Sequence, residues 1–372
     1  MKKIERIPAL DVTKFVMAVL VVAIHVQPFT ANLAFYYNNC LARIADPMFF
    51  AVSAYCLFAK LKENNWKRSV FALYMKRIIL LYAGWIVLYL PWIIASCLRE
   101  AGQGNKVAWL ANVSENGQWI ALLLQKILLA GPFGPLWFLT ALLLAIPIVY
   151  WLASHRKLWL GMAAGLPFYA VTVLWMGYRS MIPEDSAVAA AAQGGEAIFG
   201  WLANGLYYGL LFCTIGACAA IYGKCADKER QIDSEERRQQ RVRMYGGLTF
   251  FSFVLLGAEC RYIRNTGCGV SYGALFSLIP LTCFLLLFLV NTRWKDRTIF
   301  RHLCKMSTLV FVLHYGVLTV LISCCSQLIN SGSETSAWGM CYWLVLGTTI
   351  LLGELLLLLS RQKYFQWLRW LM

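Results

Sequence analysis

The chain has 372 residues, of which 60% are hydrophobic and only 14% are charged, and its formal net charge is +16. A soluble globular protein is nearer half apolar and a quarter charged, so this composition excludes an ordinary soluble domain and predicts a polytopic membrane protein. An excess of Lys and Arg would suit nucleic acid in a soluble protein. Here most of these cations fall in short loops on one side of the predicted spans, so no nucleic-acid partner is needed to explain them.

Runs of about 20 apolar residues, the length that crosses a bilayer, mark the predicted membrane helices. Ten such segments follow one another: 10–29, 45–62, 78–97, 134–154, 158–177, 200–222, 245–260, 271–291, 306–328 and 338–360. We therefore predict an all-α polytopic membrane protein of about ten transmembrane helices, with one domain over 1–372. The first segment is predicted to be a retained span and not a signal peptide, because Gln27, Pro28 and Phe29 follow it instead of small residues.

The distribution of Lys and Arg predicts the orientation, because cytoplasmic loops carry an excess of both. It places both termini in the cytoplasm, with residues 361–372 as a short cytoplasmic tail. Two predicted outer loops are long. The first contains the apolar stretch 119–131, which is too short to span and predicts an interfacial amphipathic helix. The second, 178–199, is rich in Ala and is expected to be mobile.

Three ionisable residues, Asp11, Lys14 and His25, lie in the first predicted span. In a helix, the separation of Lys14 and His25 gives about 16 Å of rise and roughly 20° of net rotation, so all three residues share one stripe. Each such group in hydrocarbon costs on the order of 2.5 kcal/mol or more and normally faces a bundle interior, which favours a functional site. The alternative is structural: Asp11 and Lys14 would form an interfacial pair, and His25 would be a packing residue.

Four cations, Lys67, Arg68, Lys76 and Arg77, lie where the third span leaves the predicted cytoplasmic side. Cations at this boundary commonly only anchor the topology of the chain. Lys and Arg at a membrane mouth also suit a polyphosphate ligand. Both interpretations remain open from the residues alone.

Further candidates lie deeper in the predicted spans. Asp46, followed by Pro47, is suited to cap a helix, and Ser53 either faces a site or bonds its own backbone. Trp137 follows a stretch of glycines and prolines at the outer rim, where an interfacial aromatic belt is also expected. His314 lies near the middle of the membrane and could share a cavity with His25.

The remaining polar groups give weaker signals. Glu259 and Glu354 are possible carboxylate partners or simply hydrogen-bonded carboxyl groups. The thirteen cysteines show no zinc-ligand spacing, so no metal site is predicted. Cys40, Cys260 and Cys268 fall in or beside predicted outer loops, where a disulfide is possible but its connectivity cannot be read.

In this order, the segments resemble the acyltransferase-3 family of integral membrane acyltransferases, which modify cell-surface glycans and related acceptors. The resemblance rests on Asp11, Lys14 and His25 in the first span, Phe49, Phe50, Ser53 and Tyr55 in the second, the LWFL segment at 136–139, and the stretch from Ser307 to His314. The sequence departs from the family pattern at two places. Ala54 replaces a glycine, and Tyr74 replaces the first of two arginines of which Arg77 fits the second.

The resemblance implies a multi-pass enzyme of the bacterial cell membrane that takes acyl-CoA, in particular acetyl-CoA, as co-substrate and keeps no permanently bound cofactor. Lys76 and Arg77 would bind the donor phosphates, and His25 would be the general base or carry the acyl group. Lys14 would orient the donor or stabilise negative charge, with Asp11 setting its position. Ser53, Trp137 and His314 would bind substrate. The acceptor would be a hydroxyl of a cell-surface polysaccharide or of its lipid-linked precursor.

The first-span pattern also resembles the membrane domain of the vancomycin-resistance serine racemases, which is thought to supply serine to a soluble racemase domain. No such domain follows Met372. A carrier for a small polar solute such as serine is therefore the main alternative to an acyltransferase. A non-catalytic membrane scaffold is a third possibility, but it leaves the ionisable stripe of the first span unexplained.

Overall fold

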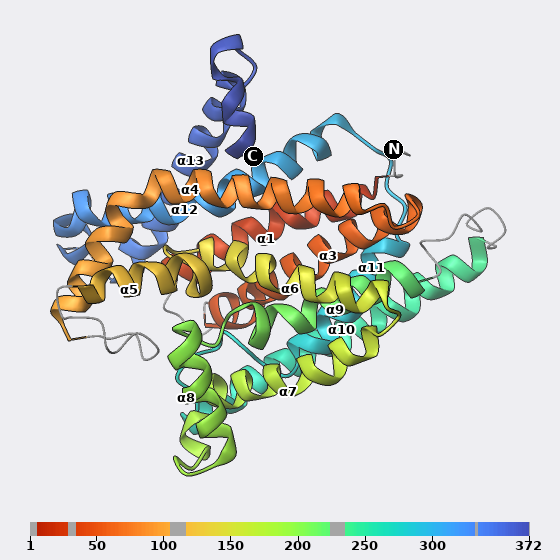
Figure 1. Cartoon of the computed structure of the whole chain (residues 1–372), viewed down its shortest axis with the longest axis horizontal. Coiled ribbons are helices and arrows are strands. Elements are labelled where there is room, and N and C mark those ends of the chain that lie inside the picture. The colour runs from red at the N-terminus through yellow and green to blue at the C-terminus, as the bar shows by residue number, and fades with distance from the viewer. Residues whose placement is uncertain (1–5, 29–34, 105–116, 224–234, 332–333, 372) are drawn as a thin grey trace.

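Figure 1 shows the computed structural model, which describes residues 6–28, 35–104, 117–223, 235–331 and 334–371. These residues form a bundle of helices, and no strand occurs among them. Eight helical stretches in the described chain are long and apolar enough to cross a membrane. The predicted class, an all-α polytopic membrane protein, is therefore confirmed.

Helices lie at all ten predicted spans. They are α1 (Pro8–Val26), α3 (Ala45–Glu63), α4 (Arg68–Gly102), α6 (Leu136–Ser154), α7 (Leu158–Gly177), α9 (Leu210–Tyr222, preceded by η7, Gly205–Gly209), α10 (Glu235–Thr266), α11 (Leu278–Asn291), α12 (Thr298–Ser331) and α13 (Glu334–Leu359). The prediction of about ten crossing helices needs one correction. The helix α11 has only 14 residues, and α10 begins with a charged segment, so neither is among the eight.

The late start of α11 has a local cause. The carboxylate of Glu259 accepts hydrogen bonds from the backbone N–H groups of Phe276 and Ser277, at 2.9 and 2.8 Å. It also accepts the hydroxyl of Ser277 and, at 3.1 Å, that of Tyr178. Glu259 thus satisfies N–H groups that would otherwise be unpaired at the start of a helix. Of the two roles considered for this residue, the structure shows the hydrogen-bonded carboxyl.

One of the two long loops predicted on the outer side has the expected structure, and the other does not. The predicted short helix at 119–131 is present as α5 (Gln118–Gln125) and its continuation η5 (Lys126–Ala130). The loop expected to be mobile instead contains the helix α8 (Ala187–Phe199). Ser186 caps α8 by accepting the N–H of Ala189 at 3.1 Å, and Ala189 and Ala192 of α8 are buried in a small apolar cluster with Trp175 of α7. Small side chains permit this close packing, which is why the Ala-rich segment forms a helix.

The predicted tail folds back on the bundle. Its helix η10 (Lys363–Leu371) packs against α4, where Trp85 Nε1 donates a hydrogen bond to the carbonyl of Leu371 at 3.2 Å. The side chain of Leu371 lies against Gly84, where a Cβ would come within 2.4 Å of it. Figure 1 shows the C-terminus beside α4 and α13.

The helix α1 occupies the centre of the fold. It packs on α3, α12 and α13, and Ala18, Val22 and Ala23 are fully buried in these contacts. Small residues let neighbouring helices approach closely in membrane proteins. The polar residues of α1 therefore lie between helices.

The three cysteines considered for a disulfide lie in two different environments. Cys260 contacts the side chain of Cys40, and its Sγ lies 3.4 Å from the carbonyl of Asn39. Cys268 instead faces the carbonyl of Gly177. All three are free thiols in the structure, and Cys40 and Cys260 are the pair that it brings together.

Candidate functional site

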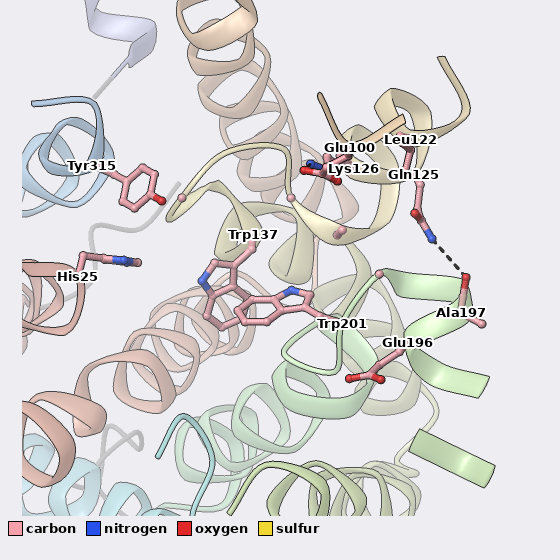
Figure 2. Close-up of a pocket in the computed structure, with 14 residues that line it drawn as sticks. His25, Glu100, Leu122, Gln125, Lys126, Trp137, Glu196, Ala197, Trp201 and Tyr315 are labelled. Carbon is pink, nitrogen blue, oxygen red and sulfur yellow. Dashed lines mark hydrogen bonds and ion pairs between the residues drawn. The ribbon is translucent and has the colours of Figure 1, made fainter. Parts of the chain in front are cut away.

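A cavity of about 490 Å³ opens beside the last turn of α1. We call it the outer cavity, because it lies at the predicted outer ends of α1, α6 and α12. Its lining comes from α1, α4, α5, η5, α6, α8 and α12 and includes His25, Glu100, Gln125, Lys126, Trp137, Glu196, Trp201 and Tyr315. Figure 2 shows His25 and Tyr315 reaching toward the same open space, with Trp137 on its other side.

His25 lies one residue before the end of α1. The helix stops because Gln27 adopts a left-handed conformation with φ of 50°, and its N–H donates to the carbonyl of Ala23 at 2.9 Å. The imidazole of His25 makes an edge contact with Tyr315 at 5.0 Å between ring centroids and a tilted contact with His314 at 5.2 Å. The two histidine rings are therefore in contact, but the cavity that they were predicted to share is lined by His25 and not by His314.

His314 is completely buried beneath this contact. Its Nδ1 lies 2.9 Å from the carbonyl of Val310. A carbonyl can only accept a hydrogen bond, so Nδ1 carries the proton and Nε2 of the neutral ring is the acceptor. Nε2 has no hydrogen-bond partner in the part of the chain that the structure describes. His314 therefore supports the ring of His25 and does not line the outer cavity directly.

The glycines of the segment 131–135 are explained by close contacts. At Gly131, where φ is 86°, a Cβ would lie 2.1 Å from the backbone of Trp137. At Gly134, with φ of 42°, a Cβ would lie 2.5 Å from the ring of Tyr315. Only glycine combines this backbone conformation with such close approach. These two residues bring the cavity rim onto the aromatic side chains that face His25.

Trp137 belongs to the wall of the cavity. Its ring makes perpendicular contacts with Trp201 at 5.5 Å and with Tyr208 at 5.9 Å. Such edge-to-face packing holds an aromatic ring in one orientation. Trp137 is thus half-buried against other aromatic rings at the cavity wall. Its predicted role in binding substrate remains a proposal.

Below the two histidines, four phenylalanines form a layer across the bundle. Phe49 and Phe50 of α3 contact Phe138 of α6 at 5.8 and 4.5 Å, and Phe311 of α12 contacts Phe49 and Phe138 at 5.1 and 5.3 Å. Phe311 also contacts the ring of His314 at 6.4 Å. We call this packed cluster between α3, α6 and α12 the aromatic layer.

Lys14 lies on the inner side of the aromatic layer. Its Nζ is 3.9 Å from Sγ of Cys56, and it lies within electrostatic range of Asp11 and Arg77. Asp11 itself is engaged by Arg6, whose Nε donates to its carboxylate at 2.5 Å. The expected alignment of Lys14 and His25 on one interior face of α1 is therefore present. The carboxylate of Asp11, however, pairs with Arg6 and not with Lys14.

Ser53 is also found in this inner region. Its side chain is hydrogen-bonded to the hydroxyl of Tyr74, which lies within electrostatic range of Arg77. Tyr74, which stands where the resemblance predicts an arginine, thus joins α4 to α3 by a hydrogen bond. The position contributes a neutral polar group where a cation was expected.

A second large cavity, of about 800 Å³, opens at the predicted cytoplasmic end of the bundle. We call it the inner cavity. Its lining is strongly basic and includes Lys76, Arg77, Arg301, His302, Lys305, Arg361 and Arg369, with no Asp or Glu among the described lining residues. Lys76 and Arg77, predicted to bind the donor phosphates, both line this cavity, and their binding role stays a prediction. Lys67 and Arg68 do not line it and are exposed at the start of α4.

Two cations of the inner cavity are held by acidic neighbours. Arg301 pairs with Asp296 at 2.5 Å, and Nε2 of His302 lies 2.5 Å from the carboxylate of Glu354. Arg369 donates from Nε to the carbonyl of Ser360 at 3.1 Å, which directs it from η10 toward the cavity. The basic residues of the tail were visible in the sequence, but their proximity to Lys76 depends on the fold-back of η10.

Comparisons with known proteins agree with this architecture. A family model described as an acyltransferase domain, the acyltransferase-3 family, matches residues 7–359. Two proteins of Enterococcus faecalis, each named an amino-acid racemase, are 24% and 23% identical over 328 and 304 residues. These matches cover 86% and 80% of the chain but only 42% and 38% of the racemases, so the chain spans about two fifths of their length. No solved structure matches. Because the family model covers nearly the whole chain, the protein belongs to the acyltransferase-3 family.

Proposed function

We propose that the protein moves an acyl group, in particular acetyl, from cytoplasmic acyl-CoA to a hydroxyl of a cell-surface glycan or of its lipid-linked precursor. The observation that carries the proposal is the basic lining of the inner cavity. Coenzyme A presents a diphosphate and a 3′-phosphate, and clustered Arg and Lys side chains are the usual partners of such groups. Lys76 and Arg77 on α4 and Arg361 and Arg369 of the tail would bind these phosphates.

The chemistry would take place at His25. Its imidazole faces the outer cavity, and a neutral imidazole can accept a proton from a hydroxyl group. His25 would take the proton of the acceptor hydroxyl, whose oxygen attacks the thioester carbonyl. The new C–O bond replaces the C–S bond, and the coenzyme A thiolate leaves with the proton. Alternatively, His25 would carry the acyl group between the donor and the acceptor.

The two cavities lie toward opposite ends of α1. Lys14 and His25 are about 16 Å apart along the helix axis, so they cannot act on the same atom. Lys14 is close enough to Arg77 for an electrostatic interaction. It would orient the donor or stabilise the negative charge that develops on it. The donor would then reach across the aromatic layer toward His25. Membrane lipids would surround the bundle, and the proposed location is the bacterial cell membrane.

Transfer is tested with the purified full chain, acetyl-CoA and a panel of sugars. Wild type is expected to release free coenzyme A, measured by chromatography, together with an equal amount of O-acetylated sugar. The alternative carrier function predicts a different result. Solute would then move across a vesicle membrane while acetyl-CoA stays intact, and that result would refute the acyltransferase.

A further inference from the structure

A smaller cavity of about 230 Å³ lies directly beside the outer cavity. The two share His25, Trp137 and Trp201 in their linings, so a ligand placed at His25 can extend into both. The smaller cavity also contains Arg43 and Asp46, which lie at the start of the second span. We call it the arginine subsite.

Arg43 lies in the 3-10 turn η2 (Ala42–Ile44), immediately before α3. Its Nε is buried and has no hydrogen-bond partner within the described residues. Asp46 is close enough for an electrostatic interaction, but no ion pair between the two is formed in the described part of the chain. A buried guanidinium with unmet donors is costly, so a ligand oxyanion that pairs with it would be strongly favoured.

Two other polar residues of this wall, Tyr208 and Ser271, already make hydrogen bonds within the protein. Tyr208 donates its hydroxyl hydrogen to the carbonyl of Gly273 at 3.4 Å. Ser271 accepts the N–H of Gly273 at 3.1 Å through its hydroxyl oxygen. The same loop lies against Arg43, since a Cβ at Gly273 would be 4.0 Å from Nη1. Arg43 is the cationic guanidinium of this wall, and its unpartnered Nε makes it the group best suited to a ligand oxyanion.

The charges of the subsite favour a single negative charge. With the carboxyl group of Asp46 protonated, Arg43 leaves one positive charge in the subsite, which a single carboxylate neutralises, whereas a phosphate dianion or diphosphate would leave negative charge unpaired. The inner cavity differs, because its described lining has many cations and no Asp or Glu. It therefore suits a ligand with several negative charges. A carboxylate, which matches the planar guanidinium in shape and carries one charge, fits the arginine subsite better.

We infer that Arg43 binds a carboxylate of the acceptor and thereby presents a nearby hydroxyl of the same molecule to His25. This inference rests on the proposed function, because it names the substrate class of that site. The volume of about 230 Å³ suits a carboxylate-bearing substituent or a small hydroxy acid. A sugar ring would occupy the larger outer cavity between Trp137 and Trp201. The acceptor class is therefore an acidic sugar or a hydroxy-amino acid, and a neutral sugar is a poorer ligand.

The test measures equilibrium binding of matched ligand pairs to the purified full chain. The pairs are glucuronate with glucose, N-acetylmuramate with N-acetylglucosamine, and L-serine with L-serinamide. For at least one pair, wild type is expected to bind the carboxylate at least about tenfold more tightly, as one charge-assisted hydrogen bond would give. The pair that shows this preference identifies the source of the carboxylate.

Arg43→Gln is expected to abolish the preference and leave binding of the neutral partner unchanged. The matched control is Arg179→Gln. Arg179 is also on the predicted outer side but pairs with Glu184 and does not line the subsite, so this variant should keep the wild-type preference. Size-exclusion elution and thermal unfolding of the purified protein report whether each variant is folded. If Arg43→Gln fails that check, Arg43→Lys replaces it and should reduce the preference.

Equal binding of both members of every pair by wild type would overturn the inference, as would a preference that persists in a folded Arg43 variant. These outcomes can be distinguished from a failure of the proposed function. Acyl transfer to neutral sugars without a carboxylate preference would refute only the role of Arg43. A carboxylate preference without any release of coenzyme A would support that role and refute the acyltransferase.

Discussion

His25→Ala should lower the rate of acetyl transfer at saturating substrates by about a thousandfold, which lies within the range expected when a general base is removed. The imidazole of His25 lines the outer cavity and contacts His314 and Tyr315 through its ring. Its removal deletes the base but leaves the inner cavity untouched. The affinity for acetyl-CoA should therefore stay near the wild-type value, which is measured by titration of the purified variant.

The matched control for this substitution is His155→Ala. His155 is an exposed histidine that follows α6 and lines neither cavity. The control should transfer acetyl groups at the wild-type rate and should elute as the same species in size-exclusion chromatography. Full transfer by a folded His25→Ala would remove His25 from the chemistry.

The double variant Lys76→Ala with Arg77→Ala should raise the KM for acetyl-CoA by about a hundredfold, because two charge-assisted contacts are lost. Both residues line the inner cavity, where their cationic side chains can pair with the phosphates of the donor. The maximal rate at saturating donor should change little, since His25 is unaffected. Initial rates measured across a range of acetyl-CoA concentrations give both parameters.

Lys67→Ala with Arg68→Ala is the control for charge alone. These residues lie at the start of α4, are exposed and do not line the cavity, so the KM should stay near wild type. Added salt should weaken donor binding in wild type and in this control, because it screens the charges of Lys76 and Arg77. The effect should be smaller in the cavity variant, which lacks these two charges. If both double variants raise KM equally, the effect comes from the general surface potential and the inner cavity is not the donor site.

Much of the bundle follows from the sequence because membrane helices leave strong local signals. Apolar length placed a helix at each predicted span, and the alignment of Lys14 with His25 followed from the geometry of a single helix. The cluster at Lys76 and Arg77 was visible for the same reason, since both lie on one segment. Local periodicity is sufficient for features within one element.

The remaining features depend on contacts between distant segments. Arg369 joins Lys76 only because η10 folds back and Trp85 binds the carbonyl of Leu371. Arg43 carries no distinguishing signal in the sequence, and its unpaired Nε becomes evident once the cavity around it is known. The pairing of Asp11 with Arg6 likewise could not be distinguished from a pairing with Lys14 by spacing alone. Helix periodicity does not specify which side chains meet across helices.

The most direct test of the account uses sealed vesicles that contain the protein in one known orientation, with acetyl-CoA on one side and acceptor sugar on the other. Acetyl-CoA cannot cross the bilayer. Transfer therefore requires the donor to bind at the inner cavity and the acceptor to bind at the outer cavity. We predict O-acetylated sugar and free coenzyme A only when acetyl-CoA is supplied to the face that carries Lys76, Arg77 and Arg369. Transfer from the opposite face, or movement of sugar across the membrane with acetyl-CoA intact, would contradict the account.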